Sequence, residues 1–403
     1  MHNNNWLLWA LLAAAITGIF CGWFFGQSML AIAWMGELFL DALKMVIIPL
    51  IVAAVISGIA SLGGADGGLK RLGGFTVLYY FCTTAIAVLL GLIIVNIIQP
   101  GAGITEVSQV VPDRVSGKED TGFIDIIRSL VGDNIIASAA ETKLLEVIVF
   151  AILFAAALTT LGERGKPLVA FFEAMNDVMI KIVVWIMYFA PIGIFALVSS
   201  KLGSSGGGEQ FWQEILGVGK YMLTVIVGLT LHFFVLMTIL IVVSRRGRQF
   251  IATMSKALIT AFGTASSSAT LPLTLECAQE AGVDKRAAKF VLPLGSTVNM
   301  DGTALYEAVA VMFIAQAYGI HMAPMDQVVI FITATLAAIG AAGIPEAGLV
   351  TMVIVLTAVG LPMEGIGLLL AVDWFLDRIR TTVNVWGDSV GSTVIERICF
   401  KSS

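Results

Sequence analysis

The sequence predicts an all-α protein that crosses a membrane several times. Of its 403 residues, 58% are hydrophobic and 13% are charged, and the mean hydropathy is +0.95. Soluble domains contain about a quarter charged residues and no more than about half apolar ones. The apolar residues run along the whole chain. The composition therefore excludes a soluble protein, and also a soluble domain carried by a single membrane anchor.

Charge and cysteine content exclude two further classes of protein. The formal net charge of −5 argues against a nucleic-acid partner, which would favour a basic face. The four cysteines, Cys21, Cys82, Cys277 and Cys399, have no metal-ligand spacing, so we expect buried thiols that behave as small apolar groups. The N-terminus lacks the basic region and cleavage site of a signal peptide, which predicts that the first apolar run stays as a span.

Apolar stretches of about 20 residues, the length that crosses a bilayer core, mark the expected spans. They cover residues 6–25, 44–62, 75–98, 144–161, 168–198 and 221–243. Residues 101–143 are mixed in character and predict a loop or interfacial helices outside the core. Basic clusters near Lys70, Arg164 and Arg246 are separated by two spans each, so all three can face the cytoplasm.

Two interrupted apolar segments indicate re-entrant hairpins. Segment 250–281 lies between basic clusters that must face the same side, and Ser266, Ser267 and Ser268 stand at its middle. Segment 328–361 consists of two short halves around a Gly-rich break with a proline. Such backbone is tolerated in a membrane only where protein or a water-filled cavity satisfies it, and paired breaks are typical of transporter binding sites. The alternatives are a kinked span or a helical pair joined by an exposed loop.

The last apolar segment carries the densest set of ionisable residues. At 100° per residue, five polar residues fall within an arc of about 80°, bordered by Thr381, while Arg378 lies off it. The five are Asp373, Asp377, Arg380, Asn384 and Asp388. Each ionisable group at a helix centre costs roughly 2.5–3.5 kcal/mol on insertion scales, which indicates a functional role. The alternative is an internal salt-bridge ladder, since Asp377 and Arg380 stand three residues apart.

A second polar cluster interrupts the apolar run 290–318. Asn299, Asp301 and Gly302 predict a helix break whose carbonyl and side-chain oxygens could bind Na⁺, a hard cation. One turn later, Glu307 is a lone carboxyl; burial disfavours its charged form, which makes it a candidate proton carrier unless an arginine pairs with it. Three hydroxyls also stand at helical spacing, a weaker signal because such groups often bond their own backbone. They are Tyr80, Thr83 and Thr84.

Five segments together resemble the dicarboxylate/amino acid:cation symporter family, which includes the glutamate transporters and the neutral amino acid exchangers. The segments are 43–50, 264–272, 299–307, 340–345 and 373–384. The likeness covers nearly the whole chain. It implies a homotrimer of protomers with eight transmembrane helices and two opposed re-entrant hairpins. It also implies an elevator mechanism in which a scaffold, 1–74 and 101–200, holds a mobile transport domain, 75–100 and 201–403, with the second hairpin as the gate.

The resemblance also implies how an acidic amino acid would bind. Arg380 would hold its side-chain carboxylate and Asp377 its amino group, while Asn384, Thr303 and the hairpin tips would hold the main-chain carboxylate. The full implied set is Ser266, Ser267, Ser268, Thr303, Gly343, Ile344, Asp377, Arg380, Thr381 and Asn384. The planar fork of an arginine matches a carboxylate, and a buried arginine favours an anionic ligand. L-glutamate and L-aspartate remain open as substrates, and a neutral amino acid or a C4-dicarboxylate is the alternative within the family.

Three sodium sites follow from the same resemblance. They comprise Gly295, Asn299, Asn384 and Asp388; Tyr80, Thr83, Thr84, Asn299 and Asp301; and carbonyl groups of Thr297, Ala338, Ile339 and Ala341. Glu307, together with Arg378 as a supporting charge, follows the animal glutamate transporters and implies H⁺ cotransport with K⁺ countertransport. No other cofactor is expected. Glu346, where Gln or Gly is usual, leaves gate dynamics open.

Two other functions are less well supported. A membrane hydrolase could use the serine run with His232 or Asp301, but no Gly-x-Ser-x-Gly elbow is present. A channel fits poorly because interrupted hairpins with a dense binding site suit occlusion better than open conduction. Residues 101–143 are short and contain no Asn-x-Ser/Thr sequon, unlike the glycosylated insert of the animal members of the family that the chain resembles. The resemblance therefore favours a multi-pass protein of a prokaryotic inner membrane.

Overall fold

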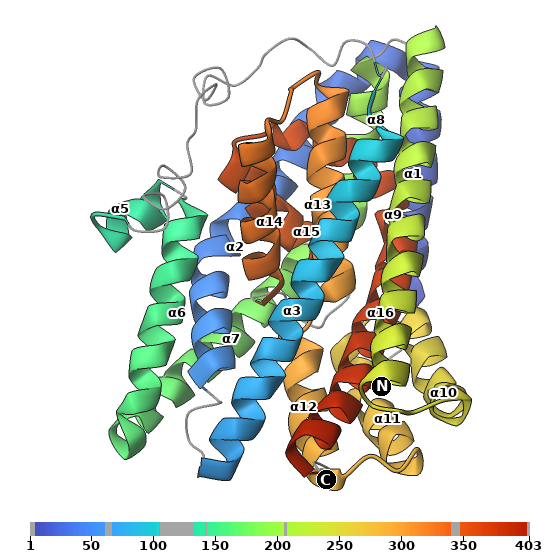
Figure 1. The fold of residues 1–403 in the computed structure, drawn as a ribbon. Coiled ribbons are helices and arrows are strands. Elements are labelled where there is room, and N and C mark those ends of the chain that lie inside the picture. The colour runs from blue at the N-terminus through green and yellow to red at the C-terminus, as the bar shows by residue number, and fades with distance from the viewer. Residues whose placement is uncertain are drawn as a thin grey trace.

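The computed structural model describes residues 5–102 except 61–66, then 104, 132–204 except 142, 208–339 and 347–400. Helices are the only regular secondary structure in this part of the chain (Figure 1). The α-helices are α1 (Asn5–Phe25), α2 (Ala33–Ala60), α3 (Gly67–Ile98), α5 (Ile135–Ala140), α6 (Leu144–Thr160), α7 (Lys166–Met187), α8 (Ala190–Ser204), α9 (Gly208–Val242), α10 (Arg248–Thr264), α11 (Ser267–Glu280), α12 (Lys285–Val298), α13 (Asp301–Ala317), α14 (Pro324–Ile339), α15 (Ala347–Val359) and α16 (Ile366–Phe400). Short 3₁₀ helices are η1 (Gly26–Ile32), η2 (Gly162–Gly165) and η3 (Met363–Gly365).

The apolar helices make this a polytopic membrane protein, as the composition predicts. Among the described residues, 4 helical stretches are long and apolar enough to cross a membrane, or 5 if one bent pair counts as a span. The stretches are Trp9–Ala60, Leu72–Ile98, Trp212–Val242 and Lys285–Ala317. Helices α6, α14 and α15 are shorter, and α16 carries several charged side chains. The count of eight spans stays a prediction.

One expected span is wrong as a single helix. Residues 168–198 form nearly all of α7 and the first part of α8, and the two helices meet at an angle of 56°. Pro191 lies at the start of α8 and has no N–H to donate to the carbonyl of Met187, so the α-helical ladder cannot continue through it. The chain turns instead through Tyr188 and Phe189, whose amides make shorter-range bonds to Trp185 and Ile186.

The serine run forms the tip of a helical pair, which we call hairpin 1 (α10 and α11). Ala265 ends α10 in the left-handed conformation, with φ of 49°. Ser266 then caps α11, and its Oγ accepts a hydrogen bond from the Ala269 amide at 3.1 Å. A tight turn between two packed helices excludes the kinked-span alternative for this segment.

The second interrupted segment also forms a packed pair, hairpin 2 (α14 and α15). The connection between its helices, residues 340–346, lies outside the described residues. Figure 1 shows the two hairpins at opposite ends of the molecule, hairpin 2 in the upper half and hairpin 1 at the lower end. The connections that carry basic clusters, including α9–α10 and α11–α12, also lie at the lower end, as the charge pattern predicts.

The predicted break in the run 290–318 separates α12 from α13. Asn299 has φ of −101° and ψ of 92°, which ends α12, and α13 starts at Asp301. Every residue of α13 except Gln316 is buried, and α3, α9, α14, α15 and α16 all pack against it. The core of the molecule therefore surrounds α13, and the break lies inside it.

Candidate functional site

The predicted polar face of the last span is buried on α16. Its five members, Asp373, Asp377, Arg380, Asn384 and Asp388, are each at most 4% exposed. The sequence spacing therefore identified a real face, and it identified Arg378 correctly as lying off that face. Charged groups withdrawn this far from water need partners, so their contacts define what the site can hold.

Arg380 is held by two carboxylates of its own helix. Its guanidinium donates from Nε and Nη2 to Asp377 Oδ1, at 3.0 and 2.7 Å, and from Nη1 to Asp373 Oδ1 at 3.3 Å. It also lies over the ring of Tyr306, 4.3 Å from the ring centroid. The internal ladder weighed as an alternative is therefore present, and Arg380 is not the uncompensated charge that the sequence argument assumed.

This ladder contains two carboxylates and one guanidinium, so it has one excess negative charge. A cation or an ammonium group entering here would balance the excess charge, and an incoming carboxylate could share the five-donor fork of Arg380. A Cβ added at Gly348 would overlap with the guanidinium, so the head of Arg380 lies directly against the backbone of hairpin 2. The binding chemistry of α16 therefore meets hairpin 2 at this point.

Asn384 connects α16 to the start of α13. Its Oδ1 accepts a hydrogen bond from the Gly302 amide at 2.7 Å, and its Nδ2 donates to Thr303 Oγ1 and Met300 Sδ, both at 3.2 Å. The two backbones touch here, because a Cβ at Gly302 would lie 2.5 Å from the carbonyl oxygen of Arg380. Thr303 is thereby placed beside the polar face, where the resemblance implied it would be.

Asp388 and the helix break form a third contact. Asp388 Oδ1 accepts from Asn299 Nδ2 at 2.9 Å, and a Cβ at Gly295 would overlap with that same oxygen. Within the described chain Asp388 makes no ion pair with a lysine or arginine. Asn299 Oδ1 is fully buried and has no hydrogen-bond partner among the residues that the structure describes. An unpaired buried oxygen beside a carboxylate is the arrangement that a hard cation would complete.

Asp301 is the meeting point of three helices. Its Oδ1 accepts from Thr83 and Thr84 of α3, at 3.2 and 2.7 Å, and its Oδ2 lies 3.0 Å from Nε2 of His232 on α9. Asp301 and His232 are both fully buried. Two of the three hydroxyls of α3 therefore contact Asp301, and their role in cation binding stays a prediction. Tyr80, the third member, instead donates its hydroxyl to the carbonyl of Val291 at 2.7 Å.

Sequence reasoning did not place His232 beside Thr83, Thr84 and Asp301. A lone histidine stands in the apolar stretch of α9, and ionisable residues within a span indicate function by default. That signal was present, but its partner lies 69 residues away and could only be found by folding the chain.

Glu307 is fully buried on α13, one turn after the break. The hydroxyl of Thr351 on hairpin 2 lies close enough to interact with its carboxyl group, which has no other hydrogen-bond partner in the described chain. Thr351 of hairpin 2 and the charge of Arg380 face it. Arg380 is already paired with Asp373 and Asp377, so the alternative of an arginine partner for Glu307 is not what the structure shows.

The remaining predicted residues fall into three groups. Ser266 and Ser267 are buried at the tip of hairpin 1, while Ser268 is exposed. Thr381 and Ala338 are buried, and Thr297 is exposed with its hydroxyl bonded to the carbonyl of Leu294. The last group lies at the tip of hairpin 2. Ala341, Gly343, Ile344 and Glu346 are outside the described residues, and the side chain of Ile339 is not described either.

Arg378 reaches across to hairpin 1. Its Nη1 donates to the carbonyl oxygens of Phe262 and Gly263, at 2.9 and 2.7 Å. These carbonyls belong to the last turn of α10, where they have no partner within the helix. The supporting charge implied by the resemblance is therefore located at the end of a hairpin helix, with its guanidinium on backbone oxygens.

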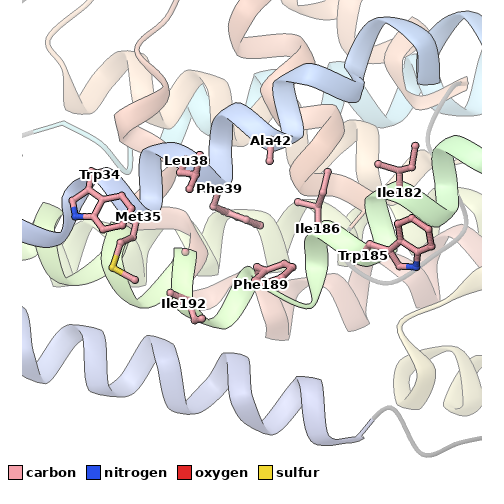
Figure 2. Close-up of a pocket in the computed structure, with 11 residues that line it drawn as sticks. Trp34, Met35, Leu38, Phe39, Ala42, Ile182, Trp185, Ile186, Phe189 and Ile192 are labelled. Atoms are coloured by element: carbon pink, nitrogen blue, oxygen red, sulfur yellow. The ribbon is translucent and has the colours of Figure 1, made fainter.

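A separate apolar groove lies between α2, α7 and α8 (Figure 2). No charged side chain lines it, and it includes none of the predicted site residues. Its lining is Trp34, Met35, Leu38, Phe39, Ala42, Ile182, Trp185, Ile186, Phe189, Ile192 and Gly193. A zwitterion would find no partner there, so the polar cluster around α13 and α16 is the candidate site.

The matches to known proteins cover the part of the chain that contains this polar cluster. Residues 7–398 match the sodium:dicarboxylate symporter family. Excitatory amino acid transporter 3 of Oryctolagus cuniculus is 39% identical over 99% of this chain and 86% of the relative. An excitatory amino acid transporter of Caenorhabditis elegans is 37% identical over 98% of this chain and 88% of the relative. The matched region contains every buried polar residue described above.

Proposed function

Because the chain belongs to the sodium:dicarboxylate symporter family, we propose that it takes up acidic amino acids, L-glutamate or L-aspartate, together with Na⁺. It is a transporter and not an enzyme, so no catalytic residue and no cofactor are expected. The observation that carries the substrate class is the pair of opposite charges, Asp377 and Arg380, buried side by side on α16. An amino acid with a second carboxylate presents an ammonium to the first and a carboxylate to the second.

Sodium coupling is supported by the excess of buried carboxylates. Asp301 and Asp388 lie on either side of the α12–α13 break, and the unpaired Asn299 oxygen lies beside Asp388. Neither carboxylate is paired with a lysine or arginine in the described chain, and bound Na⁺ ions would neutralise their charge. We assign Asp301, Asp388 and Asn299 to sodium on this ground.

The elevator mechanism is proposed with residues 1–74 and 101–200 as scaffold and 75–100 and 201–403 as transport domain. The packing supports this division, because α2 packs on α6, α7 and α8, while α3, α9 and α12–α16 surround the polar cluster. Hairpin 2 is the proposed gate, since Gly348 lies against the head of Arg380. A substrate held by Arg380 would therefore touch the element that must open.

We further propose that the protein is a homotrimer in contact with membrane lipid, and that its membrane is a prokaryotic inner membrane. The many exposed apolar side chains on α1, α2 and α7 need lipid or neighbouring protomers to cover them. Native mass spectrometry of the detergent-solubilised protein tests the trimer, and a monomer mass at all detergent concentrations would contradict it.

Uptake into proteoliposomes tests the function. With an inward Na⁺ gradient, labelled glutamate and aspartate are expected to accumulate, and replacing Na⁺ by choline should remove the accumulation. Labelled serine and succinate report the neutral amino acid and C4-dicarboxylate alternatives in the same preparation. Uptake of serine or succinate, with no uptake of glutamate or aspartate, would support the neutral amino acid or C4-dicarboxylate alternative instead. The absence of Na⁺-dependent uptake of all four compounds would overturn the proposal.

Proton coupling is proposed to use Glu307. The Glu307→Gln variant cannot gain or lose a proton at this position, so its net uptake should lose dependence on external pH and on internal K⁺, while glutamate–glutamate exchange persists. The measurement is uptake and exchange at several pH values with and without internal K⁺. Glu163→Gln, on the exposed turn η2, is the matched control and should keep the wild-type profile. An unchanged pH profile in Glu307→Gln would remove the proton-carrier role.

His232 is expected to support sodium affinity through Asp301. A hydrogen bond to a carboxylate contributes about 1.5–3 kcal/mol, so His232→Ala should raise the Na⁺ concentration for half-maximal uptake roughly tenfold or more. His232→Gln, whose amide can donate, should recover part of the loss. His321→Ala alters an exposed histidine and should change nothing. Equal Na⁺ dependence in His232→Ala and the wild type would contradict the role.

A further inference from the structure

At the base of hairpin 1, Arg246 contacts the end of α11. Arg246, in the connection between α9 and α10, donates from Nη1 to the carbonyl of Ala281 at 2.6 Å and from Nη2 to that of Gly282 at 2.8 Å. These carbonyls follow the last turn of α11, where backbone oxygens have no helical partner and the helix dipole is negative. Arg246 therefore caps the C-terminal end of hairpin 1.

The same guanidinium is linked to the last helix. Its Nη2 lies 2.6 Å from Glu396 Oε2, and Glu396 is only 2% exposed. The other oxygen of Glu396 accepts a hydrogen bond from the Asp284 amide at 3.0 Å, just before α12. One ion pair, with Glu396 buried and the Arg246 side chain 16% exposed, thus joins four segments: the α9–α10 connection, the end of α11, the start of α12 and the C-terminal part of α16.

The opposite end of hairpin 1 is fastened to α16 as well. Arg378 holds the carbonyls of Phe262 and Gly263 at the end of α10, next to the serine tip. The C-terminal ends of both hairpin helices are therefore capped by arginines, and both caps lead to α16. In α14 and α15, as far as they are described, no side chain forms an ion pair with α16.

We propose that Arg246 and Glu396 act as positioning residues: they fix hairpin 1 to α16 as one body, so that the serine tip stays in register with Asp377 and Arg380. Helices α10 and α11 also pack on α16, and the two arginine contacts lie at opposite ends of hairpin 1. Together they would restrict both rotation of the hairpin about Arg378 and movement of its tip. The consequence for transport rests on the proposed function. The rigidity itself is a property of the fold and can be measured without transport.

Hydrogen exchange tests the rigidity. Loss of one partner of a buried ion pair favours local opening, so Glu396→Gln should speed amide exchange in peptides covering 278–285, and also in those covering 262–270, by at least about tenfold. Glu396→Gln keeps the shape of the side chain and leaves Arg246 on the α11 carbonyls. Arg246→Ala, which also removes the cap, should speed exchange further.

The control is an exposed ion pair within hairpin 1. Lys256 and Glu280 join α10 to α11 at 3.1 Å, but their side chains are 61% and 56% exposed. Exposed pairs contribute little, so Lys256→Gln should leave exchange within about twofold of the wild type. Exchange in Glu396→Gln and Arg246→Ala that matches Lys256→Gln would overturn the proposal. Should Arg246→Ala fail to elute as a folded protein, Glu396→Gln alone decides.

Transport kinetics separate this proposal from the proposed function. In proteoliposomes Glu396→Gln should raise the substrate KM about threefold to tenfold, because the tip is less well positioned, with a smaller change in the maximal rate. Arg246→Lys keeps the charge and should recover part of the KM. If the wild type takes up no amino acid, the proposed function fails while the exchange result still stands. If exchange is unaffected, the positioning role fails whatever the transport result.

Discussion

Replacement of Arg380 by cysteine is expected to abolish uptake of glutamate and aspartate. Removing one partner of a buried charge pair costs about 2–5 kcal/mol in binding, so the affinity for acidic substrates should fall roughly 30-fold or more. The loss should be selective, because the fork of Arg380 is proposed to hold only the side-chain carboxylate. Serine has no side-chain carboxylate, so serine uptake by the variant should be equal to or greater than that of the wild type.

Controls must separate binding from folding, since the variant leaves Asp373 and Asp377 without their guanidinium. Thermal unfolding followed by tryptophan fluorescence reports whether the fold survives. Arg380→Lys keeps the charge but loses the fork, and should also bind acidic substrates poorly. Arg286→Cys removes an exposed arginine and should behave as wild type. Full glutamate uptake by Arg380→Cys would remove this residue from the substrate site.

Asp301→Asn should have the second largest effect, on the sodium dependence. The substitution keeps the size of the side chain and its bonds to Thr83 and Thr84, but it removes a negative charge that is fully buried. A charge-assisted contact of this kind contributes about 1.5–3 kcal/mol, so the Na⁺ concentration for half-maximal uptake should rise on the order of 10- to 100-fold. The measurement is substrate uptake against external Na⁺ at fixed ionic strength.

The control for Asp301 is Asp177→Asn, which removes an exposed carboxylate of α7. It changes the net charge equally and should leave the Na⁺ dependence unchanged. Asp301→Asn combined with His232→Ala should show a loss smaller than the sum of the two separate losses, because the two residues act through one contact. A sodium dependence unaltered by Asp301→Asn would exclude this carboxylate from cation binding.

The features that the sequence predicts well are those set by local spacing. The polar face of α16 follows from 100° per residue, and the break at Asn299 follows from polar residues inside an apolar run. The serine tip follows from the polar run at the middle of an apolar segment whose flanking basic clusters must face the same side. Each of these depends on residues close together in the chain, so no knowledge of packing is needed.

Features that depend on distant contacts could not be predicted in the same way. His232 gives no sign of its partner, and Arg246 resembles an ordinary basic residue of a cytoplasmic loop until Glu396 is placed beside it. The bend at Pro191 was missed because the apolar run continues through it, and hydrophobicity does not report a missing N–H. Arg380 was expected to pair with an anionic ligand, whereas its partners in the structure are Asp377 and Asp373, one and two turns earlier on the same helix.

The contact between α13 and α16 at Gly302 limits how the cargo of such a protein could be re-engineered. With the carbonyl of Arg380 only 2.5 Å from where a Cβ would stand, the two helices cannot be spread by a larger residue without displacing backbone. A library that randomises Gly302 should therefore return mostly inactive clones. Substrate specificity is better changed by substituting the polar side chains of α16, because such substitutions keep the spacing between α13 and α16.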